Sequence, residues 1–463
     1  MEPIALDFEP GLYRQGTIYQ CPPGRFYDGA LMRMGEGVRK PMGGWAVGLA
    51  GTLSGNPRAA FAWKDNDRNS FAAFATHSKL YIHDGTTLED ITPSGFTAGD
   101  ANFSDCTMDN FGETLLAMFD TNGTLLEYTP LGGGDATAVA NAPTGSAIVV
   151  TPERFPVVIG ANGNPRMIQW PDQETLTIWT ATATNQAGDL ELQTKGELVC
   201  GVRVNGGTLI FSDHDLFFMK YVGLPDVYGV RQAGDQCGII GKHAYTTVDQ
   251  IAYWMGESCF WIWMGYAEQL PCEISDDIFK NLNTTHRHKV WARHDAKNGE
   301  IWFYYPRDAA TECSHVAIYT YRGDRHWNHF PLARNCGFEA GVFLNPIMVT
   351  AAGAMLKHEF GWSYDGAERF LLSSCFEIGT GGKLLYIDEI VPDESNQGDC
   401  EVYLYLSEYP TDGETMIGPF SAADRIPVEI AARKVRMEFR AADATQDFRI
   451  GRYRAFVRPW SLY

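Results

Sequence analysis

The chain has 463 residues and a formal net charge of −20, with 45% hydrophobic and 13% aromatic residues. This apolar content excludes a disordered protein, and the negative charge argues against a protein that binds nucleic acid through a basic surface. The negative charge is still compatible with a protein surface that DNA slides past, because like charges keep the phosphates from adhering. The 48 glycines and 23 prolines fit a fold with many short turns, so we expect an all-β protein.

The start of the chain shows no targeting segment. Residues 1–10 are acidic and lack the basic start and apolar centre of a secretory signal. No apolar run reaches the roughly 18 residues of a membrane helix, so we expect a soluble chain made in a cytoplasm. The ten cysteines include no CxxC pair, and we therefore expect free buried thiols rather than a disulfide framework.

Residues 1–50 are rich in glycine and proline, with PPG at 22–24 and PMGGW at 41–45, and have little periodicity. They predict an extended N-terminal arm that packs on the rest of the chain or on a neighbouring subunit.

From residue 71 to 362 the sequence repeats a unit of apolar strand, turn and apolar strand. The clearest unit is the aromatic pair 250–255 and 259–264, separated by Gly-Glu-Ser. The second strands of the units align on seven residues: Leu80, Leu125, Met167, Leu216, Phe260, Val316 and Met355. The intervals between them are 45, 42, 49, 44, 56 and 39 residues.

A period of this length is typical of propeller blades, because one small sheet cannot cover both of its faces and sheets stack around an axis until the ring closes. We therefore expect a β-propeller of six to seven blades over residues 51–374. An ordinary meander or sandwich is the alternative interpretation.

Residues 375–463 differ from the repeats because their strands are longer and alternate strictly between apolar and polar residues. In the strand 433–439, Val435, Met437 and Phe439 share one face, while the charged residues between them share the other. This pattern predicts a C-terminal antiparallel β-sandwich with one face in solvent. Its strands are expected at 383–391, 400–409, 425–430, 433–439 and 448–457.

Charge divides this last module, with a net charge of −10 in residues 375–424 and +5 in residues 425–463. In one interpretation, acidic and basic strands are neighbours inside one sandwich. In the other, the acidic edge of one subunit meets the basic edge of the next in a ring. The candidate residues for such a ring interface are Arg433, Arg436, Arg440 and Glu401.

No residue pattern predicts a catalytic site, a metal site or a cofactor. The histidines of the run 285–295 lack a close cysteine or carboxylate that would complete a zinc site, and His214 has no nucleophile nearby. Carboxylate pairs that a glycosidase would need occur at 65 and 67, 213 and 215, and 276 and 277. Such pairs are typical of solvated turns, so we predict a structural or binding protein and no enzyme.

Residues 237–327 resemble the tail hub or nozzle proteins of short-tailed bacteriophages, also called packaged-DNA stabilisation proteins. The resemblance is carried by Gly238 to Ala244, Trp254 to Gly256, Phe260 with Trp261, Leu270 to Cys272, Ile278 with Phe279, Leu282 with Asn283, Lys289 with Val290, Glu300 to Pro306, and Trp327. The pairs 434–436 and 448–452 look like strands near the C-termini of phage tail proteins. The resemblance is clear over about 90 residues and fainter over about 150 more.

The resemblance implies a propeller-bearing subunit of the virion tail, assembled in the host cytoplasm. Six copies would form a ring beneath the portal and adaptor, in contact with other tail proteins and around the exit channel. The ring would retain packaged DNA and let it pass at ejection, without sequence-specific contacts. Acidic residues near the central hairpin, Glu268, Glu273, Asp276 and Asp277, are the candidates for lining the channel.

Two other functions are open at this stage. A β-propeller glycoside hydrolase or carbohydrate-binding protein would need convergent carboxylates and aromatic residues at a funnel mouth. A propeller that serves as a protein-interaction platform would be a monomer.

Overall fold

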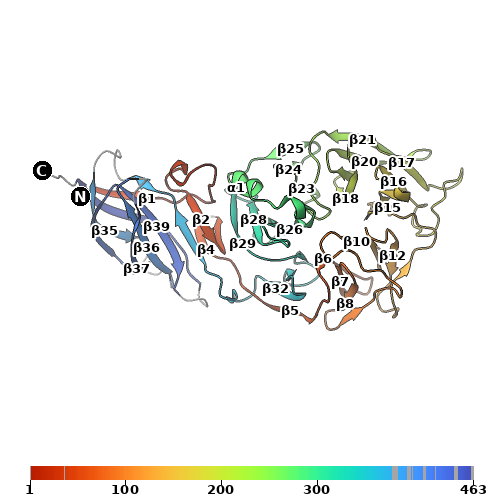
Figure 1. Ribbon diagram of the computed structural model, residues 1–463, viewed down its shortest axis with the longest axis horizontal. Helices are drawn as coiled ribbons and strands as arrows, with labels where there is room; N and C mark the ends of the chain where they lie inside the picture. The colour runs from red at the N-terminus through yellow and green to blue at the C-terminus, as the bar shows by residue number, and fades with distance from the viewer. Residues whose placement is uncertain are drawn as a thin grey trace.

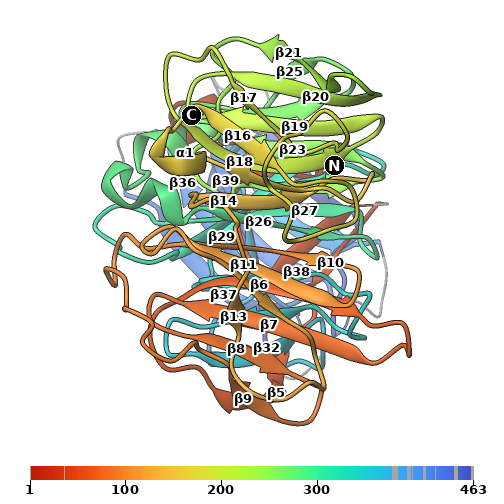
Figure 2. The same cartoon turned by 90° about the vertical axis from the view of Figure 1, so that its right-hand side faces the viewer.

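A computed structural model describes residues 2–35, 37–377, 384–393, 398, 400–409, 413–422, 424–442 and 447–459. The chain forms a ring of small sheets with a pair of packed sheets at its side (Figure 1). Viewed from the far side of the ring, the strands of the packed pair lie behind it (Figure 2). None of the helices in the described part of the chain has the length and apolar character that crossing a membrane requires.

The described residues of the ring form seven antiparallel sheets of four strands. The first three are β6 (Pro57–Lys64), β7 (Ser70–Thr76), β8 (Leu80–His83) and β9 (Leu88–Asp90); β10 (Cys106–Phe111), β11 (Thr114–Phe119), β12 (Leu125–Tyr128) and β13 (Thr137–Ala138); and β14 (Ala147–Val150), β15 (Pro156–Ile159), β16 (Met167–Trp170) and β17 (Gly188–Glu191). The 3-10 turn η2 (Ala161–Gly163) lies within the third sheet.

The next three sheets continue around the ring. They are β18 (Leu198–Val204), β19 (Gly207–Ser212), β20 (Leu216–Gly223) and β21 (Val227–Gly234); β22 (Tyr245–Val248), β23 (Ile251–Met255), β24 (Phe260–Trp263) and β25 (Ala267–Leu270); and β26 (Trp291–Asp295), β27 (Glu300–Tyr305), β28 (His315–Thr320) and β29 (His326–Pro331). The helix α1 (Ser275–Lys280) and the 3-10 helix η3 (Thr284–Lys289) connect the fifth sheet to the sixth.

The seventh sheet closes the ring with strands from both ends of the propeller sequence. It contains β30 (Cys336–Phe338), β31 (Ile347–Val349), β32 (Ala354–His358) and, as its outer strand, β5 (Trp45–Thr52). Its first strand, β30, contacts β6 of the first sheet. The predicted propeller is therefore confirmed, with seven blades.

The seven residues used to align the repeats are each the first or second residue of a third strand, in β8, β12, β16, β20, β24, β28 and β32. The prediction of the period was correct, although it numbered these strands as second. The first strands pack against one another around the axis of the ring.

The sheets at the side of the propeller form the predicted sandwich. One contains β1 (Glu2–Leu6), β40 (Tyr453–Pro459), β35 (Leu385–Pro392) and β38 (Ile426–Ala432). The other contains β2 (Phe26–Ala30), β33 (Phe370–Ser373), β39 (Lys434–Ala441), β36 (Cys400–Ser407) and β37 (Thr415–Ser421), and β34 (Phe376–Glu377) also pairs with β39. Lys383, where a strand was expected to begin, lies outside the described residues.

The first 50 residues differ from the expected arm. β1 pairs with β40 and β2 pairs with β33, so this segment supplies one strand to each sheet of the sandwich before β5 enters the propeller. The 3-10 helix η1 (Ile18–Gln20) lies between β1 and β2, and the hairpin of β3 (Met32–Gly35) and β4 (Val38–Pro41) lies between β2 and β5. Glycines and prolines interrupt the short strands and hide their alternation, but Leu6, Phe8 and Phe26 are fully buried.

The sandwich and the sixth blade share one interface. Strand β2 lies against β29, and the backbone N–H of Leu12 donates to the carbonyl of Trp327 at 2.8 Å. One hydrophobic core runs across the interface, with Phe8 and Phe439 on the sandwich side and Phe260 and Trp327 on the propeller side. Because the burial is continuous, we describe the two parts as one packed body.

Three arginines of the N-terminal segment reinforce this interface. Arg14 pairs with Asp277 at 2.9 Å, and Arg25 pairs with Glu273. Arg33 donates two hydrogen bonds to Glu300, at 2.6 and 2.9 Å, and two more to Glu359, at 3.0 and 3.2 Å. Each of these arginines therefore links the N-terminal segment to the propeller through an ion pair with a carboxylate.

Candidate functional site

The candidate site is one end of the propeller axis, which we call the mouth. The loops between successive sheets and the turns between second and third strands meet there. A cavity of about 780 Å³ opens at this end, over the second to fifth blades. Its lining includes the ionisable residues Asp105, Asp120, Glu197, Asp213, Lys242, Glu257, Arg287 and His288.

The centre of the mouth is an ion pair across the axis. Asp105 precedes β10 and His243 precedes β22, and Nε2 of His243 lies 3.2 Å from Oδ1 of Asp105 and 2.9 Å from the carbonyl of Cys106. Burial raises the pKa of Asp105, but the attraction and hydrogen bond of His243 overcome it and bring the pKa to about 2. Burial lowers the pKa of His243, and Asp105 more than compensates, so this pKa lies above its ordinary value.

Lys242 ties three blades together beside this pair. Its Nζ donates to Asp120 at 3.1 Å and to the carbonyl of Ser146 at 2.8 Å. Asp120 in turn accepts from the backbone N–H of Asp105, at 3.0 and 3.1 Å. The carboxylates of Asp105 and Asp120 at the centre of the mouth therefore already form hydrogen bonds and ion pairs with other groups of the same chain.

The loop from Ala101 to Ser104 covers part of the mouth. It connects the first blade to the second, yet the carbonyl of Asn102 accepts from Nε2 of His288, between the fifth and sixth blades, at 2.9 Å. Phe103 stacks on His286 and His288, with ring centroids 5.7 and 5.5 Å apart. These two histidines of the sequence therefore support a loop across the axis.

A second ionic cluster lies beneath the loop. Glu312 accepts from Arg58 at 2.8 and 3.0 Å, from Lys289 at 2.8 Å and from Asn335 at 2.8 Å. Burial raises the pKa of Glu312, but the hydrogen bonds and positive charges of Arg58 and Lys289 together outweigh it, so the net pKa is lowered. The cluster joins the first, sixth and seventh blades.

Beyond the Asp105–His243 pair, a second cavity of about 520 Å³ follows the axis. In it Arg203 pairs with Asp109 at 2.8 Å, and burial raises the pKa of Asp109. The thiol next to Asp105, Cys106, is buried, and burial raises its pKa well above the ordinary value. It is protonated at neutral pH and is not an activated nucleophile.

The acids expected to line a channel lie away from the mouth. Asp277 of α1 pairs with Arg14 and with Arg307 at 2.8 Å. Burial raises its pKa, but these arginines lower it far below the ordinary value. Glu273 pairs with Arg25 at the same interface with the sandwich. Glu268, on the outer strand β25, and Asp276 are exposed to solvent.

The residues proposed for a ring interface form contacts within the sandwich. Arg436 is only 7% exposed and donates to Glu414 at 3.0 Å. Arg440 pairs with Glu438 at 2.6 Å and lies opposite Glu401 on the neighbouring strand. Arg433 stacks over a tyrosine ring. The acidic β36 and the basic β39 are antiparallel neighbours, as in the first of the two interpretations.

The polar face of β39 was predicted to lie in solvent, but part of it is buried. Arg436 and Glu438 are buried, because Glu414 and the hydroxyl of Tyr405, 2.6 Å from Glu438, satisfy their charges. A strictly alternating strand shows which residues share a face, but not that the polar face is covered by paired charges.

The sequence did not reveal the mouth. Its central residues, Asp105 and His243, are 138 positions apart, and neither belongs to a local motif. The available signal was the adjacent pair Lys242 and His243, which follows the apolar residues Ile239 and Ile240 directly before a strand.

No known protein family and no curated protein matches the sequence. Among solved structures, a catalytically inactive virginiamycin B lyase from Staphylococcus aureus has a TM-score of 0.43 and 9% identity, covering 66% of this chain and 97% of its own. YCF48 from Cyanidioschyzon merolae has a TM-score of 0.41 and 10% identity, covering 68% of this chain and 98% of its own. The β-propeller domain of Cps50 (Swd1) from Myceliophteria thermophila has a TM-score of 0.42 and 7% identity, with the same coverage. The propeller assignment stands on the seven sheets themselves.

Proposed function

We propose that this chain is a structural subunit of the tail of a short-tailed bacteriophage, in the hub or nozzle ring below the portal and adaptor. The resemblance of residues 237–327 suggests it, and one structural observation supports it most. Ion pairs between blades that are not neighbours cross the propeller axis, with a cavity on either side of the Asp105–His243 pair, so the propeller is a block closed across its axis.

A closed block has a consequence for the path of DNA. No polymer threads a single propeller whose axis is crossed by Asp105, His243 and the loop at Phe103. In this proposal several copies of the chain form a homo-oligomeric ring, and DNA passes through the channel that the ring encloses. The net charge of −20 suits that wall, because phosphates slide past carboxylates without adhering.

The interface between the propeller and the sandwich also supports a mechanical role. Arg33 is 11% exposed and its partner Glu300 only 1%, so the pairing is shielded from solvent and salt. Together with the continuous core, it holds two domains in one orientation, as a subunit under the pressure of packaged DNA requires.

Purified virions of the phage that carries this gene provide the test. We expect mass spectrometry to find the chain in a fixed ratio to the portal protein, and antibodies against it to label the tail. Particles made without the gene should package DNA and then lose it. Virions that lack the chain would refute the proposal.

The alternative is a propeller glycoside hydrolase or carbohydrate-binding protein, and the mouth cavity is the observation in its favour. Among the described residues, Glu197 and Asp213 line that cavity without a cationic partner, and the backbone N–H of Glu197 donates to Asp213 at 3.0 Å. Asp105 is ionised at neutral pH and is not available as a general acid. Binding or cleavage of a polysaccharide that is lost in Asp213→Asn would favour this alternative.

A further inference from the structure

The cavity beyond the Asp105–His243 pair, which we call the axial cavity, is enclosed by all seven blades. Its volume is about 520 Å³, and each first strand contributes to its lining: β6, β10, β14, β18, β22, β26 and β30. His243 lines the cavity and pairs with Asp105, and Arg58 lines it and pairs with Glu312. A cavity of this volume is large enough for a small molecule.

The wall of the axial cavity combines backbone polar groups with apolar side chains. Each first strand is an edge strand of its sheet, so its backbone N–H and C=O groups on the side of the axis have no neighbouring strand in that sheet. Buried peptide groups need a hydrogen-bond partner, and in a cavity this partner is water or a ligand. The apolar part of the lining includes Phe61, Met108, Val149 and Phe338. The cavity therefore fits a small molecule that has polar ends and an apolar body.

Arg203 brings unused hydrogen-bond donors into the axial cavity. Its Nη2 donates to Asp109 at 2.8 Å, whereas its Nε and Nη1 have no hydrogen-bond partner among the described residues. The side chain is 45% exposed although it lies in the lining of the cavity. Asp109 also accepts from the backbone N–H groups of Asn110 and Val150, each at 2.8 Å. The free edge of the guanidinium can therefore bind a carboxylate without displacing Asp109.

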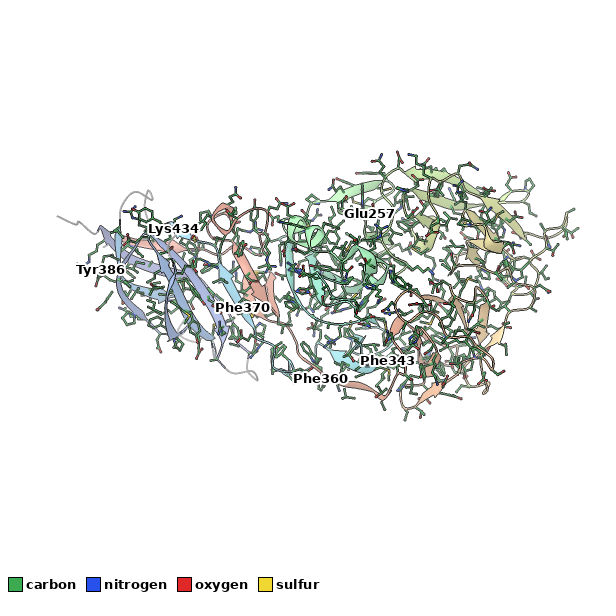
Figure 3. The ribbon with its side chains drawn as sticks, in the orientation of Figure 1. Glu257, Phe343, Phe360, Phe370, Tyr386 and Lys434 are labelled. Atoms are coloured by element: carbon green, nitrogen blue, oxygen red, sulfur yellow. The ribbon has the colours of Figure 1, made fainter. Side chains whose placement is uncertain are left out.

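Glu339 is a carboxylate of the lining that pairs with no cation in the described part of the chain. It directly follows β30, at the start of the connection 339–346. Burial raises the pKa of Glu339, and its own backbone N–H and Arg293 offset this rise only in part. The ring of Phe343 packs against Phe338 with centroids 5.5 Å apart, which anchors the connection on the seventh blade (Figure 3). An ammonium group in the cavity would supply the cation that Glu339 lacks.

Tyr245 is close to both of these charged groups. It lines the axial cavity from β22, and burial raises the pKa of its hydroxyl. Asp109 and Glu339 add to this rise and Arg203 opposes it, so all three charges act on the same hydroxyl. The free donors of Arg203 and the unpaired carboxylate of Glu339 therefore belong to one part of the cavity.

We propose that the axial cavity binds a small zwitterion, a free amino acid whose carboxylate meets Arg203 and whose ammonium meets Glu339. A ligand with a single charge would satisfy only one of these two groups, and a neutral sugar would satisfy neither charge. The apolar side chains of the lining provide contacts for the carbon skeleton. The inference goes beyond the proposed function and does not depend on it, because the cavity is complete within one chain.

Ligand-observed NMR with the full-length chain tests the site. The probes are straight-chain amino acids from glycine to aminohexanoate, which vary the spacing between the two charges, together with leucine and phenylalanine. Each probe is compared with its two halves, the amine without the carboxylate and the acid without the ammonium. The best amino acid should bind at least roughly tenfold more tightly than either half, because it fills both charged positions at once.

Two variants separate the two ends of the ligand. Glu339→Gln should bind the amino acid no better than the acid alone, because the position for the ammonium is lost. Arg203→Met should bind it no better than the amine alone, because the position for the carboxylate is lost. Asp109 keeps its two backbone hydrogen bonds in Arg203→Met, and thermal melting checks that both variants fold. If Arg203→Met is unstable, Glu339→Gln carries the test by itself, since it breaks no ion pair of the described residues.

The control is Glu191→Gln, which changes an exposed acid on the outer strand β17 of the third blade and should bind like the wild type. The inference is overturned if no probe binds at about 10 mM, a concentration that nearly fills a site with a dissociation constant of about 1 mM. It is also overturned if the halves bind as tightly as the amino acids, or if Glu339→Gln keeps the wild-type preference. None of these results bears on whether the chain is present in virions, which tests the proposed function separately.

Discussion

Replacing Arg33 by methionine should destabilise the folded chain strongly. The arginine is the cation for Glu300 and Glu359, whose side chains are 1% and 12% exposed. Removing one partner of a buried ion pair costs about 3–5 kcal/mol, because the remaining charge is left without compensation. The unfolding entropy of a chain of this length is about 1 kcal/mol per kelvin, so the melting temperature should fall by about 3–5 °C.

The penalty should also depend on pH. Burial raises the pKa of Glu300, and Arg33 opposes that rise, leaving the pKa above its ordinary value. Without Arg33 this pKa rises further, so the folded variant binds a proton more tightly than the unfolded chain does. The loss of stability should therefore be largest at neutral pH and shrink as the pH falls through the raised pKa of the variant.

Differential scanning calorimetry of wild type and variant between pH 5 and pH 8 measures both effects. The matched control is Arg154→Met, because Arg154 pairs with Glu174 at 3.4 Å while both side chains are more than half exposed. Such a pair contributes about 0–1 kcal/mol, and its melting temperature should change by less than about 1 °C. Equal shifts in the two variants, or a penalty from Arg33→Met that grows at low pH, would refute the argument. Adding Glu300→Gln to Arg33→Met should restore part of the loss.

Three further predictions concern other parts of the molecule. In Asp105→Asn, the pKa of His243 followed by NMR should drop below 6.5, because burial and Lys242 then act without the opposing carboxylate; a pKa unchanged from the wild type would contradict the pair across the axis. The wild-type Asp105 has a pKa of about 2 in the folded state and about 3.9 unfolded, so it should stabilise the fold above about pH 4 and lose this effect as the pH falls toward 2. Eight of the ten cysteines are buried, so a thiol reagent monitored by mass spectrometry should modify at most two in the native chain and all ten after denaturation.

The propeller was predictable because its third strands repeat a local pattern. Leu80, Leu216 and Phe260 each follow a tight turn and open a run of buried residues, so the period is visible without knowledge of the ring. The first strands surround a polar axis and carry charged residues such as Asp109 and Arg203, which weakens their apolar signal. The strand count of a blade was therefore harder to obtain than its period.

Contacts between distant segments were not predictable. β5 pairs with β32, about three hundred positions later, and β1 pairs with β40 across nearly the whole chain. No local pattern specifies such partners, and the glycines and prolines of the N-terminal segment suggested an arm. The mouth was not predictable for the same reason. Asp105 and His243 meet only because the ring brings the second and fifth blades to one axis.

The closing strand has a consequence for biosynthesis. β5 leaves the ribosome well before its partner β32, which ends at His358, so the outer edge of the seventh sheet cannot form until about three hundred further residues have been translated. The sandwich is completed later still, because β40 must be translated before it can pair with β1. Ring closure and docking of the sandwich are therefore late events on a nascent chain, and a fusion or truncation that removes the first 52 residues deprives both domains of strands at once.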